Sequence, residues 1–387
     1  MTRPLLIIFL TIFVNLVGFG IIIPLLPFYA ETFGASPLTI GLLFAVFSAC
    51  QLVAAPVLGD LSDRYGRRPI LIFSLAGTVV SFVMMALAHS IAMLFAARIV
   101  DGLSGGNIST ARAYVADVTE PKDRAKAYGL IGAAFGLGFI MGPAMSGVLA
   151  TVSITAPIWA AAAVTLVATL MAWLWLPETV HRASAGTGMP FRNLSEMLKR
   201  PGLRRMLWID FIYWFAFAIF QTTFALFAAH RFGFDASQTG YFFAAFGVLG
   251  AVVQGAVIRP VVHRLGDRST FILGLVCAAV GLVATTYAHT VVLFTMALVP
   301  LALGIGFGHP TVSALVSRAG RADEQGRVQG AAGAMESLGR AFGPVWGNAA
   351  LARYGDAMPY LSAAGCLALT LILSLTYSVA DPDALVG

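Results

Sequence analysis

The chain has 387 residues, of which 59% are hydrophobic and only 11% are charged, and its formal net charge is +6. A soluble domain usually carries about 25% charged residues, and no soluble fold of this length can bury so much apolar surface. The composition therefore predicts an integral membrane protein. It also leaves no room for a separate soluble catalytic domain, so we do not expect an enzyme.

Twelve apolar segments follow one another along the chain, each long enough for a helix that crosses the hydrocarbon core of a bilayer. The first segment is too long for the apolar region of a secretory signal, so we expect it to be retained as a helix. In chain order, the expected helices span 5–29, 38–61, 69–88, 91–116, 124–151, 155–176, 203–229, 238–264, 269–288, 291–317, 325–352 and 358–379.

One long polar segment, rich in Arg, Ser and Gly, follows the sixth helix at 177–202 and predicts a linker between two bundles, 1–176 and 203–387. The halves also repeat, because DRYGRRPIL from Asp63 matches HRLGDRSTF from His263. We therefore expect an all-α membrane fold of twelve transmembrane helices in two pseudo-symmetric six-helix bundles. Parallel repeats of this kind favour a substrate site between the halves near the bilayer midplane, and transport by alternating access.

Basic residues recur in alternate loops, which excludes one basic face for a nucleic acid. Loops rich in Lys and Arg lie in the cytoplasm under the positive-inside rule, so we expect a multi-pass protein of a bacterial inner membrane with both termini in the cytoplasm. The three cysteines lie in apolar segments and the six histidines show no ligand spacing, so we expect no metal and no cofactor. The basic loops contain Arg64, Arg67 and Arg68; Lys122, Arg124 and Lys126; the cluster at 182–205; Arg264 and Arg268; and Arg318, Arg321 and Arg327.

The segment GDLSDRYGRRPIL, from Gly59 to Leu71, lies in a short loop between the second and third helices. Gly59 and Gly66 permit a tight loop, Asp63 can sit at a helix N-terminus, and the arginines can pair across the interface between the halves. The pattern resembles the loop 2–3 motif of the major facilitator superfamily. RIVDG from Arg98 and AYVADVT from Ala113 are similar to two further motifs of that family.

The resemblance implies the major facilitator fold and a gating motif in which an acid at the end of the fourth helix pairs with the loop's basic residues. The gating residues are then Gly59, Asp63, Arg64, Gly66, Arg67, Arg68 and Asp117.

The fifth helix carries Gly138, Gly142, Pro143 and Gly147, a pattern similar to the antiporter motif of exporting members. The eleventh helix repeats it with Gly343 and Pro344. Small residues let membrane helices approach closely, and this packing role alone also explains the pattern. Only the resemblance makes the motif indicate export.

Within the family, the chain resembles the drug/proton antiporters, and in particular the tetracycline-type exporters. Those exporters carry membrane acids on helices 1, 3 and 9, but the matching positions here are Asn15, Ser81 and Ala278. We therefore expect the proton site elsewhere, and we do not expect metal-chelated tetracycline as the substrate.

Ionisable residues at membrane depth are costly, which makes them functional candidates. The candidates for proton coupling are Asp210, Asp101, Glu336 and Arg98. Arg98 with Asp101, and Glu336 with Arg340, have helical spacings that also allow local neutralisation. Asp210 has no helical partner of opposite sign on its inner side, and burial favours the protonated form of a carboxyl group. The alternative for Asp210 is a residue near the interface that reaches water.

Dispersed polar and aromatic residues indicate an apolar cavity for an amphipathic substrate. The aromatic residues of the seventh helix fit a lipid-facing position equally well. Arg112 suits either an anionic substrate or a pair with Asp117, and His309 is equally explained by packing. The cavity candidates are Asn15, Gln51, Asn107, Arg112, Tyr213, Trp214, Phe217, Gln221, Gln254 and His309.

These observations predict a proton-coupled secondary active exporter of small amphipathic or drug-like compounds. An uptake or facilitative carrier of a specific sugar or organic anion is the first alternative, and a membrane receptor or scaffold is the second. We expect a monomer whose partners are its small-molecule substrate, protons and the lipid bilayer.

Overall fold

The computed structural model describes the whole chain except residues 1–2, 106, 121–123, 180–189, 322–323 and 377–387. Every regular element in this described part is a helix. The chain divides into two compact units: Met1–Thr187 with Gly233–Gly247, and Gly188–Phe232 with Val248–Gly387. We describe each unit by itself.

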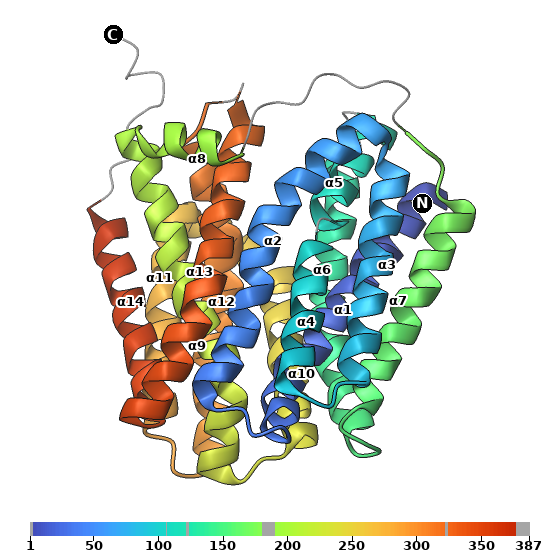
Figure 1. Cartoon of the computed structure of the whole chain (residues 1–387). Helices are drawn as coiled ribbons and strands as arrows, with labels where there is room; N and C mark the ends of the chain where they lie inside the picture. Colours follow the sequence, from blue (N-terminus) through green and yellow to red (C-terminus); the bar gives the residue numbers. More distant parts are fainter. Residues whose placement is uncertain (1–2, 106, 121–123, 180–189, 322–323, 377–387) are drawn as a thin grey trace. The chain divides into compact units, whose positions relative to one another are not determined.

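The first unit is built around its N-terminal helix, α1, which packs against α6 and α7. α3 packs against α7 and α4, and α2 packs against α4 (Figure 1). Two of these helices begin at serine caps, because Ser36 Oγ accepts from Thr39 N and Ser90 Oγ accepts from Met93 N. The bounds are α1 (Arg3–Glu31), α2 (Pro37–Tyr65), α3 (Arg67–Ala86), α4 (Ile91–Leu103), α5 (Asn107–Val118), α6 (Arg124–Ala150) and α7 (Ala156–Trp175).

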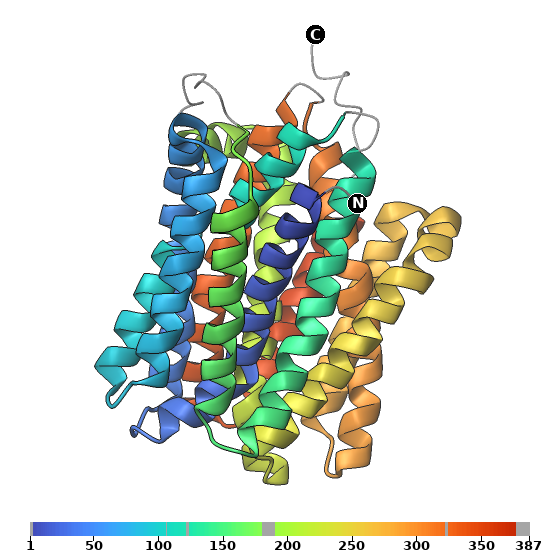
Figure 2. The same ribbon diagram turned by 90° about the vertical axis from the view of Figure 1, so that its right-hand side faces the viewer.

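The second unit is organised around α9, which packs against α13 and α14. α11 packs against α14 and runs beside α12 (Figure 2). The bounds are α8 (Pro190–Leu198), α9 (Pro201–Phe232), α10 (Ala236–Val252), η1 (Val253–Val257), α11 (Ile258–Thr286), α12 (Val291–Arg318), α13 (Gln325–Tyr354) and α14 (Ala357–Leu375). The first residues of α10, up to Gly247, belong to the first unit.

Among the described residues, nine helical segments are long and apolar enough to cross a membrane. One of them, Ala236–Thr286, contains two of the twelve expected helices, and its chain turns at Gly266, where φ is 77°. The expected helix 91–116 is divided into α4 and α5, and α13 is the remaining expected helix. The twelve expected spans are therefore all accounted for, and the protein is an all-α, multi-pass membrane protein as predicted.

The segment expected as a plain linker contains a short helix, α8. Its residue Met197 is fully buried, whereas Lys199 and Arg200 just beyond the helix are exposed. Two ion pairs join this region to the start of α13, from Glu196 to Arg327 and from Arg200 to Glu324. The helix is therefore a docked part of the second unit, which the polar composition of the segment did not predict.

Candidate functional site

A buried carboxylate lies inside α9, at Asp210. The residue is nine positions from the start of the helix, which places it about 14 Å along the axis. Its exposed fraction is 1%, and neither carboxylate oxygen accepts a hydrogen bond from a described residue. The Trp214 indole is the neighbouring hydrogen-bonding group, yet no bond of normal geometry joins it to the carboxylate. Such groups are rare in protein interiors because they have lost their hydration without a replacement.

The indole of Trp214, one turn further along α9, connects Asp210 to two other helices. On one side the guanidinium carbon of Arg340, on α13, lies 5.2 Å from the ring centroid. The imidazole of His309, on α12, meets the same ring edge-on, with the centroids 4.9 Å apart. The Phe217 ring packs against it at 5.6 Å. Three helices therefore bring titratable groups to one aromatic side chain.

Two charged residues of α13, Glu336 and Arg340, act electrostatically on Asp210. Glycines on the same helix allow this proximity. A Cβ atom at Gly339 would lie 2.9 Å from Phe215 N, and one at Gly343 would lie 2.7 Å from Phe215 O. Because any side chain at these positions would push α13 away from α9, the glycines hold the charged residues close to Asp210.

Tyr213 is the next buried polar residue of this cluster. Its hydroxyl is buried and has no hydrogen-bond partner among the described residues. Gly308 of α12 makes room for it, since a Cβ atom there would lie 2.8 Å from the hydroxyl oxygen. Asp210, Tyr213 and Trp214 thus lie within about one helical turn, and each carries a buried polar atom that has no hydrogen-bond partner in the described part of the chain.

The first unit contains a different buried charge pair, Arg98 with Asp101 on α4. Arg98 Nη1 lies 3.0 Å from Asp101 Oδ2, and the exposed fraction of Arg98 is 1%. The guanidinium carbon also lies 4.1 Å from the centroid of Phe47 on α2. The local pairing that the three-residue spacing allows is therefore present.

The basic loop between α2 and α3 centres on Arg67. Its guanidinium contacts Asp63, bonds Ser62 Oγ at 2.7 Å, and bonds Asp117 of α5 at 3.1 Å. The pairing that the resemblance implied for Asp117 is therefore present. The expectation that Asp63 sits at a helix N-terminus is wrong, because Asp63 belongs to the last turn of α2 and pairs with the residue four positions later.

Glu178, which lies outside the predicted loop motif, caps α3 instead. The carboxylate of Glu178 accepts from Arg67 N at 2.9 Å and from Arg68 N at 3.2 Å. Gly66 has a φ of 107°, and a Cβ atom there would collide with the Glu178 carboxylate. An acid three residues after the end of α7 was the available signal, but its partners lie 111 and 110 positions earlier in the chain.

A family model described as Major Facilitator Superfamily matches residues 8–344 of this chain. The chain belongs to the major facilitator superfamily. This membership confirms the family and the fold predicted from the loop motif, and it identifies the protein as a membrane transporter rather than an enzyme.

Individual relatives agree with this assignment. The chain is 33% identical over 352 residues to the class C tetracycline resistance protein of Escherichia coli, covering 89% of this chain and 88% of the relative. It is 34% identical to the class G protein of Vibrio anguillarum, with 85% of each chain covered. It is 31% identical to multidrug resistance protein 2 of Bacillus subtilis (strain 168), covering 87% of this chain and 86% of the relative.

Solved structures give the same fold. The human organic anion transporter MFSD10 (TETRAN) aligns with a TM-score of 0.75 at 25% identity, covering 96% of this chain and 99% of that one. A mutant of the nucleoside transporter NupG aligns with a TM-score of 0.82 and the same coverage. At 14% identity, the second similarity concerns the fold only.

The departure from the tetracycline-type pattern has a clear setting in the structure. Ser81 is buried and donates to Ala97 O of α4 at 2.9 Å. Ala278 is buried where α11 packs closely against Gly304 of α12. Asn15, on α1, is half-buried. Two of the three positions are therefore filled by tight helix packing.

The helix-packing motif of α6 faces two different helices. A Cβ atom at Gly138 would contact Leu16 of α1, and one at Gly142 would lie 2.6 Å from Val17 O. Gly147 instead faces α10, where Ser237 Oγ donates to its carbonyl oxygen at 2.7 Å. These close contacts explain why the start of α10 groups with the first unit.

In α13, Pro344 follows the close contact at Gly343, and the carbonyl oxygen of Pro344 accepts from the Asn348 side chain at 2.9 Å.

The remaining cavity candidates do not gather at one place within either unit. Gln51 of α2 donates to Gly105 O at 3.3 Å, beside the division between α4 and α5. Gln221 is buried in α9, whereas Arg112 of α5 and Gln254 of η1 are exposed. Asn107 begins α5, and its side chain lies outside the described part of the chain.

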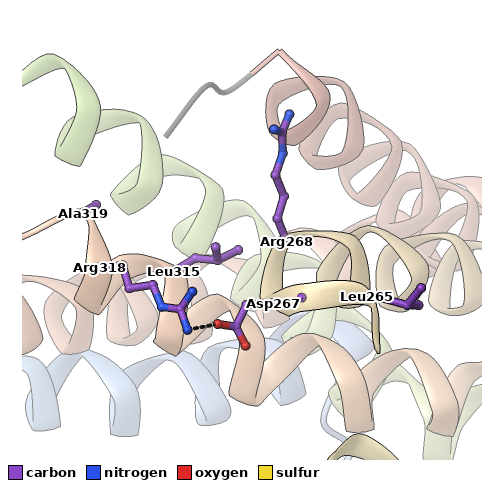
Figure 3. A pocket seen from close by; sticks show the side chains of 7 residues that line it. Leu265, Asp267, Arg268, Leu315, Arg318 and Ala319 are labelled. Atoms are coloured by element: carbon purple, nitrogen blue, oxygen red, sulfur yellow. Dashed lines mark ion pairs between the residues drawn. The ribbon is translucent and has the colours of Figure 1, made fainter. Parts of the chain in front are cut away.

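The second half has its own version of the loop motif, at Gly266. Like Gly66, this glycine has a positive φ, which supports the repeat seen in the sequence. A pocket of about 250 Å³ lies beside it (Figure 3). Asp267 and Arg318 face each other across the pocket as an ion pair, and Arg268 points the other way to donate to Ser374 O and Leu375 O. These contacts tie α11 to α12 and α14.

In the first half, Arg68 has the matching role, because it donates to Trp173 O of α7. Arg64 pairs with Asp60 at 2.9 Å.

Proposed function

We propose that the protein is a proton-coupled exporter of small amphipathic or drug-like compounds that works by alternating access. The similarity to tetracycline and multidrug resistance proteins supports export, and the buried carboxylate of Asp210 supports proton coupling. The distribution of basic loops supports a position in a bacterial inner membrane with both termini in the cytoplasm. We propose that it acts as a monomer.

Asp210 carries the proton in this proposal. Its carboxylate is buried in a membrane helix and receives no hydrogen bond from a described residue, so no hydrogen bond stabilises the ionised form in this arrangement. Protonation removes the charge, and a change of access to the other side of the membrane then releases the proton. The substrate moves in the opposite direction during the same cycle.

The driving force is sufficient with one proton. A pH difference of one unit supplies about 1.4 kcal/mol and a potential of 100 mV supplies about 2.3 kcal/mol. Together they sustain a gradient of about two to three decades for a neutral substrate. No second acid is therefore required by the energetics.

The experiment compares the wild type with Asp210→Asn in proteoliposomes that contain a pH-sensitive dye. When a substrate is added outside wild-type proteoliposomes, antiport carries the substrate inward and protons outward. The pH of the lumen is therefore expected to rise. The variant is expected to bind the same substrate but to lose this proton movement. Asp356→Asn is a matched control, because Asp356 is half-buried at the start of α14 and pairs with His230 at 2.9 Å. Coupled flux at the wild-type rate in Asp210→Asn contradicts the proposal.

An organic anion carrier is the second candidate, supported by the similarity to the human organic anion transporter MFSD10. Arg112 is exposed on α5 and offers a cation to such a substrate. The same proteoliposomes distinguish the two functions. Accumulation of an organic anion that depends on Arg112 and moves no protons favours the carrier, whereas proton movement opposite to a drug favours the exporter.

The loop between α2 and α3 is the proposed gate. Arg67 joins the last turn of α2 to α5 through Asp63 and Asp117, so breaking these contacts frees two helices of the first unit. We propose that this network holds one of the two access states. It does not contribute to substrate recognition.

A further inference from the structure

The position of Arg340 is unexpected for a cation near a buried carboxylate. Its guanidinium lies over the indole of Trp214, and the two oxygens of Asp210 accept no hydrogen bond from any described group. The Nε atom of Arg340 is also buried and has no hydrogen-bond partner among the described residues, while its Nη2 atom donates to Ser337 Oγ at 3.5 Å. A donor and an acceptor that would satisfy each other thus lie in the same cluster without a bond between them.

We propose that Arg340 is a positioning residue that alternates between the Trp214 indole and the Asp210 carboxylate as Asp210 loses and regains its proton. The inference rests on the proposed role of Asp210 and adds the group that controls proton release. The structure then corresponds to the protonated state, in which the neutral carboxyl group leaves Arg340 on the indole.

The relative strength of the two contacts supports such a movement. A guanidinium is attracted to the face of an indole, but a charge-assisted hydrogen bond to an ionised carboxylate in a low-dielectric interior is stronger. A hydrogen bond from the guanidinium to a neutral carboxyl group is weaker, because it lacks the attraction between opposite charges. The protonation state of Asp210 therefore decides which of the two partners Arg340 prefers.

The other groups near Asp210 do not replace Arg340 in this role. On α13, Glu336 is a second acid and acts on Asp210 with the same sign of charge. On α12, His309 meets the Trp214 ring edge-on. On α9 itself, Tyr213 and Trp214 are neutral, and the cations Arg204 and Arg205 lie six and five positions before Asp210. Arg205 donates to Leu373 O of α14. The described residues of α14, which also packs against α9, include no Asp, Glu, Lys, Arg or His. Of these described groups, Arg340 is the cation that acts electrostatically on Asp210.

The movement of Arg340 also links the protonation of Asp210 to the packing of α9 against α13. Arg340 lies on α13, one turn before Gly343, where α13 contacts α9 without an intervening side chain. A guanidinium that leaves the indole for Asp210 shifts its attachment by about one turn along α9. The protonation of Asp210 is thereby linked to the register between α9 and α13.

The test follows the fluorescence of Trp214 in the purified full-length protein, reconstituted in nanodiscs. The difference between the wild type and Trp214→Phe isolates this signal from the other tryptophans. Over about pH 5–10, one transition is expected in the wild type and none in Asp210→Asn. In Arg340→Gln the midpoint is expected to move upward by at least about one pH unit, which corresponds to a tenfold tighter hold on the proton.

Matched variants separate positioning from a structural role. Arg340→Lys keeps the charge, so its transition is expected to remain, with a midpoint within about half a pH unit of the wild type. Glu336→Gln and His309→Gln are expected to retain the transition. A transition that persists in Asp210→Asn, that is unmoved in Arg340→Gln, or that disappears in His309→Gln overturns the inference. If Arg340→Gln fails to fold, a transition lost in Arg340→Lys overturns it equally.

Transport measured in parallel distinguishes the two proposals. If substrate drives proton movement that depends on Asp210 but Trp214 shows no transition, the proposed function stands and the inference about Arg340 fails. If Trp214 behaves as expected but substrate moves no protons, the exporter proposal fails while the link between Asp210 and Arg340 remains.

Discussion

Removal of the Glu178 carboxylate is expected to loosen the start of α3. This side chain accepts hydrogen bonds from the first two backbone N–H groups of the helix, at 2.9 and 3.2 Å. Loss of an N-terminal cap usually costs about 0.5–2 kcal/mol, and a negative charge at this end of a helix contributes about 0.3–1 kcal/mol. The loss of two hydrogen bonds raises this cost, and the partial exposure of the site lowers it. We therefore expect Glu178→Ala to destabilise the start of α3 by about 2 kcal/mol.

Glu178→Gln retains a hydrogen-bond acceptor but loses the charge, so we expect it to destabilise the start of α3 by about 1 kcal/mol. These free energies correspond to an increase in local opening of about 30-fold for Glu178→Ala and about fivefold for Glu178→Gln.

Hydrogen exchange measured by mass spectrometry tests these values on peptides that contain the amides of Arg67 and Arg68. The start of α4, capped by Ser90, provides an internal reference whose exchange should not change. Glu31→Gln, at the last residue of α1, is the control substitution. Unchanged exchange at Arg67 and Arg68 in Glu178→Ala refutes the reasoning, as does an equal increase at the reference peptide.

Two further predictions concern packing and surface charge. Gly142→Ala places a Cβ atom 2.6 Å from Val17 O, so overpacking of about 1–3 kcal/mol should lower the unfolding temperature in detergent. Gly136→Ala on the same helix meets no atom within 4 Å and should be neutral or slightly stabilising; equal effects at both positions would show that α1 and α6 are not in close contact. Glu196→Arg and Arg327→Glu should each weaken the docking of α8 by up to about 1 kcal/mol, seen as faster proteolysis of the linker. The double variant should restore resistance, and its failure to do so would mean that this ion pair does not hold α8.

The family and the fold were predictable because a bilayer imposes a simple requirement on sequence. Each span needs a long apolar segment, and irregular backbone is not tolerated against lipid, so helices can be recognised one at a time. The loop motif was equally local, since Gly66 and the neighbouring arginines are adjacent in the chain. The positive φ at Gly66 and Gly266 supports the repeat that the two matching segments had indicated.

Two local features were not predicted. The division between α4 and α5 follows Leu103, in the stretch DGLSGGNIST, whose glycine, serine and asparagine residues we had included in one continuous span. The helix α8 has only nine residues, and its polar residues made it look like a linker. In both cases the deciding contacts come from other helices, through Gln51 at the division and through Arg327 at α8.

The sequence by itself determined where the helices lie, which residues are ionisable at membrane depth, and to which family the chain belongs. Only the tertiary structure decided which of those residues meet. It brought Asp210, Trp214 and Arg340 together from helices more than 100 residues apart, and it showed Glu178 rather than Asp63 capping α3. The physical reason is that a helix specifies its own neighbours at three and four positions, whereas contacts between helices depend on glycines that permit close approach at particular heights along the bundle.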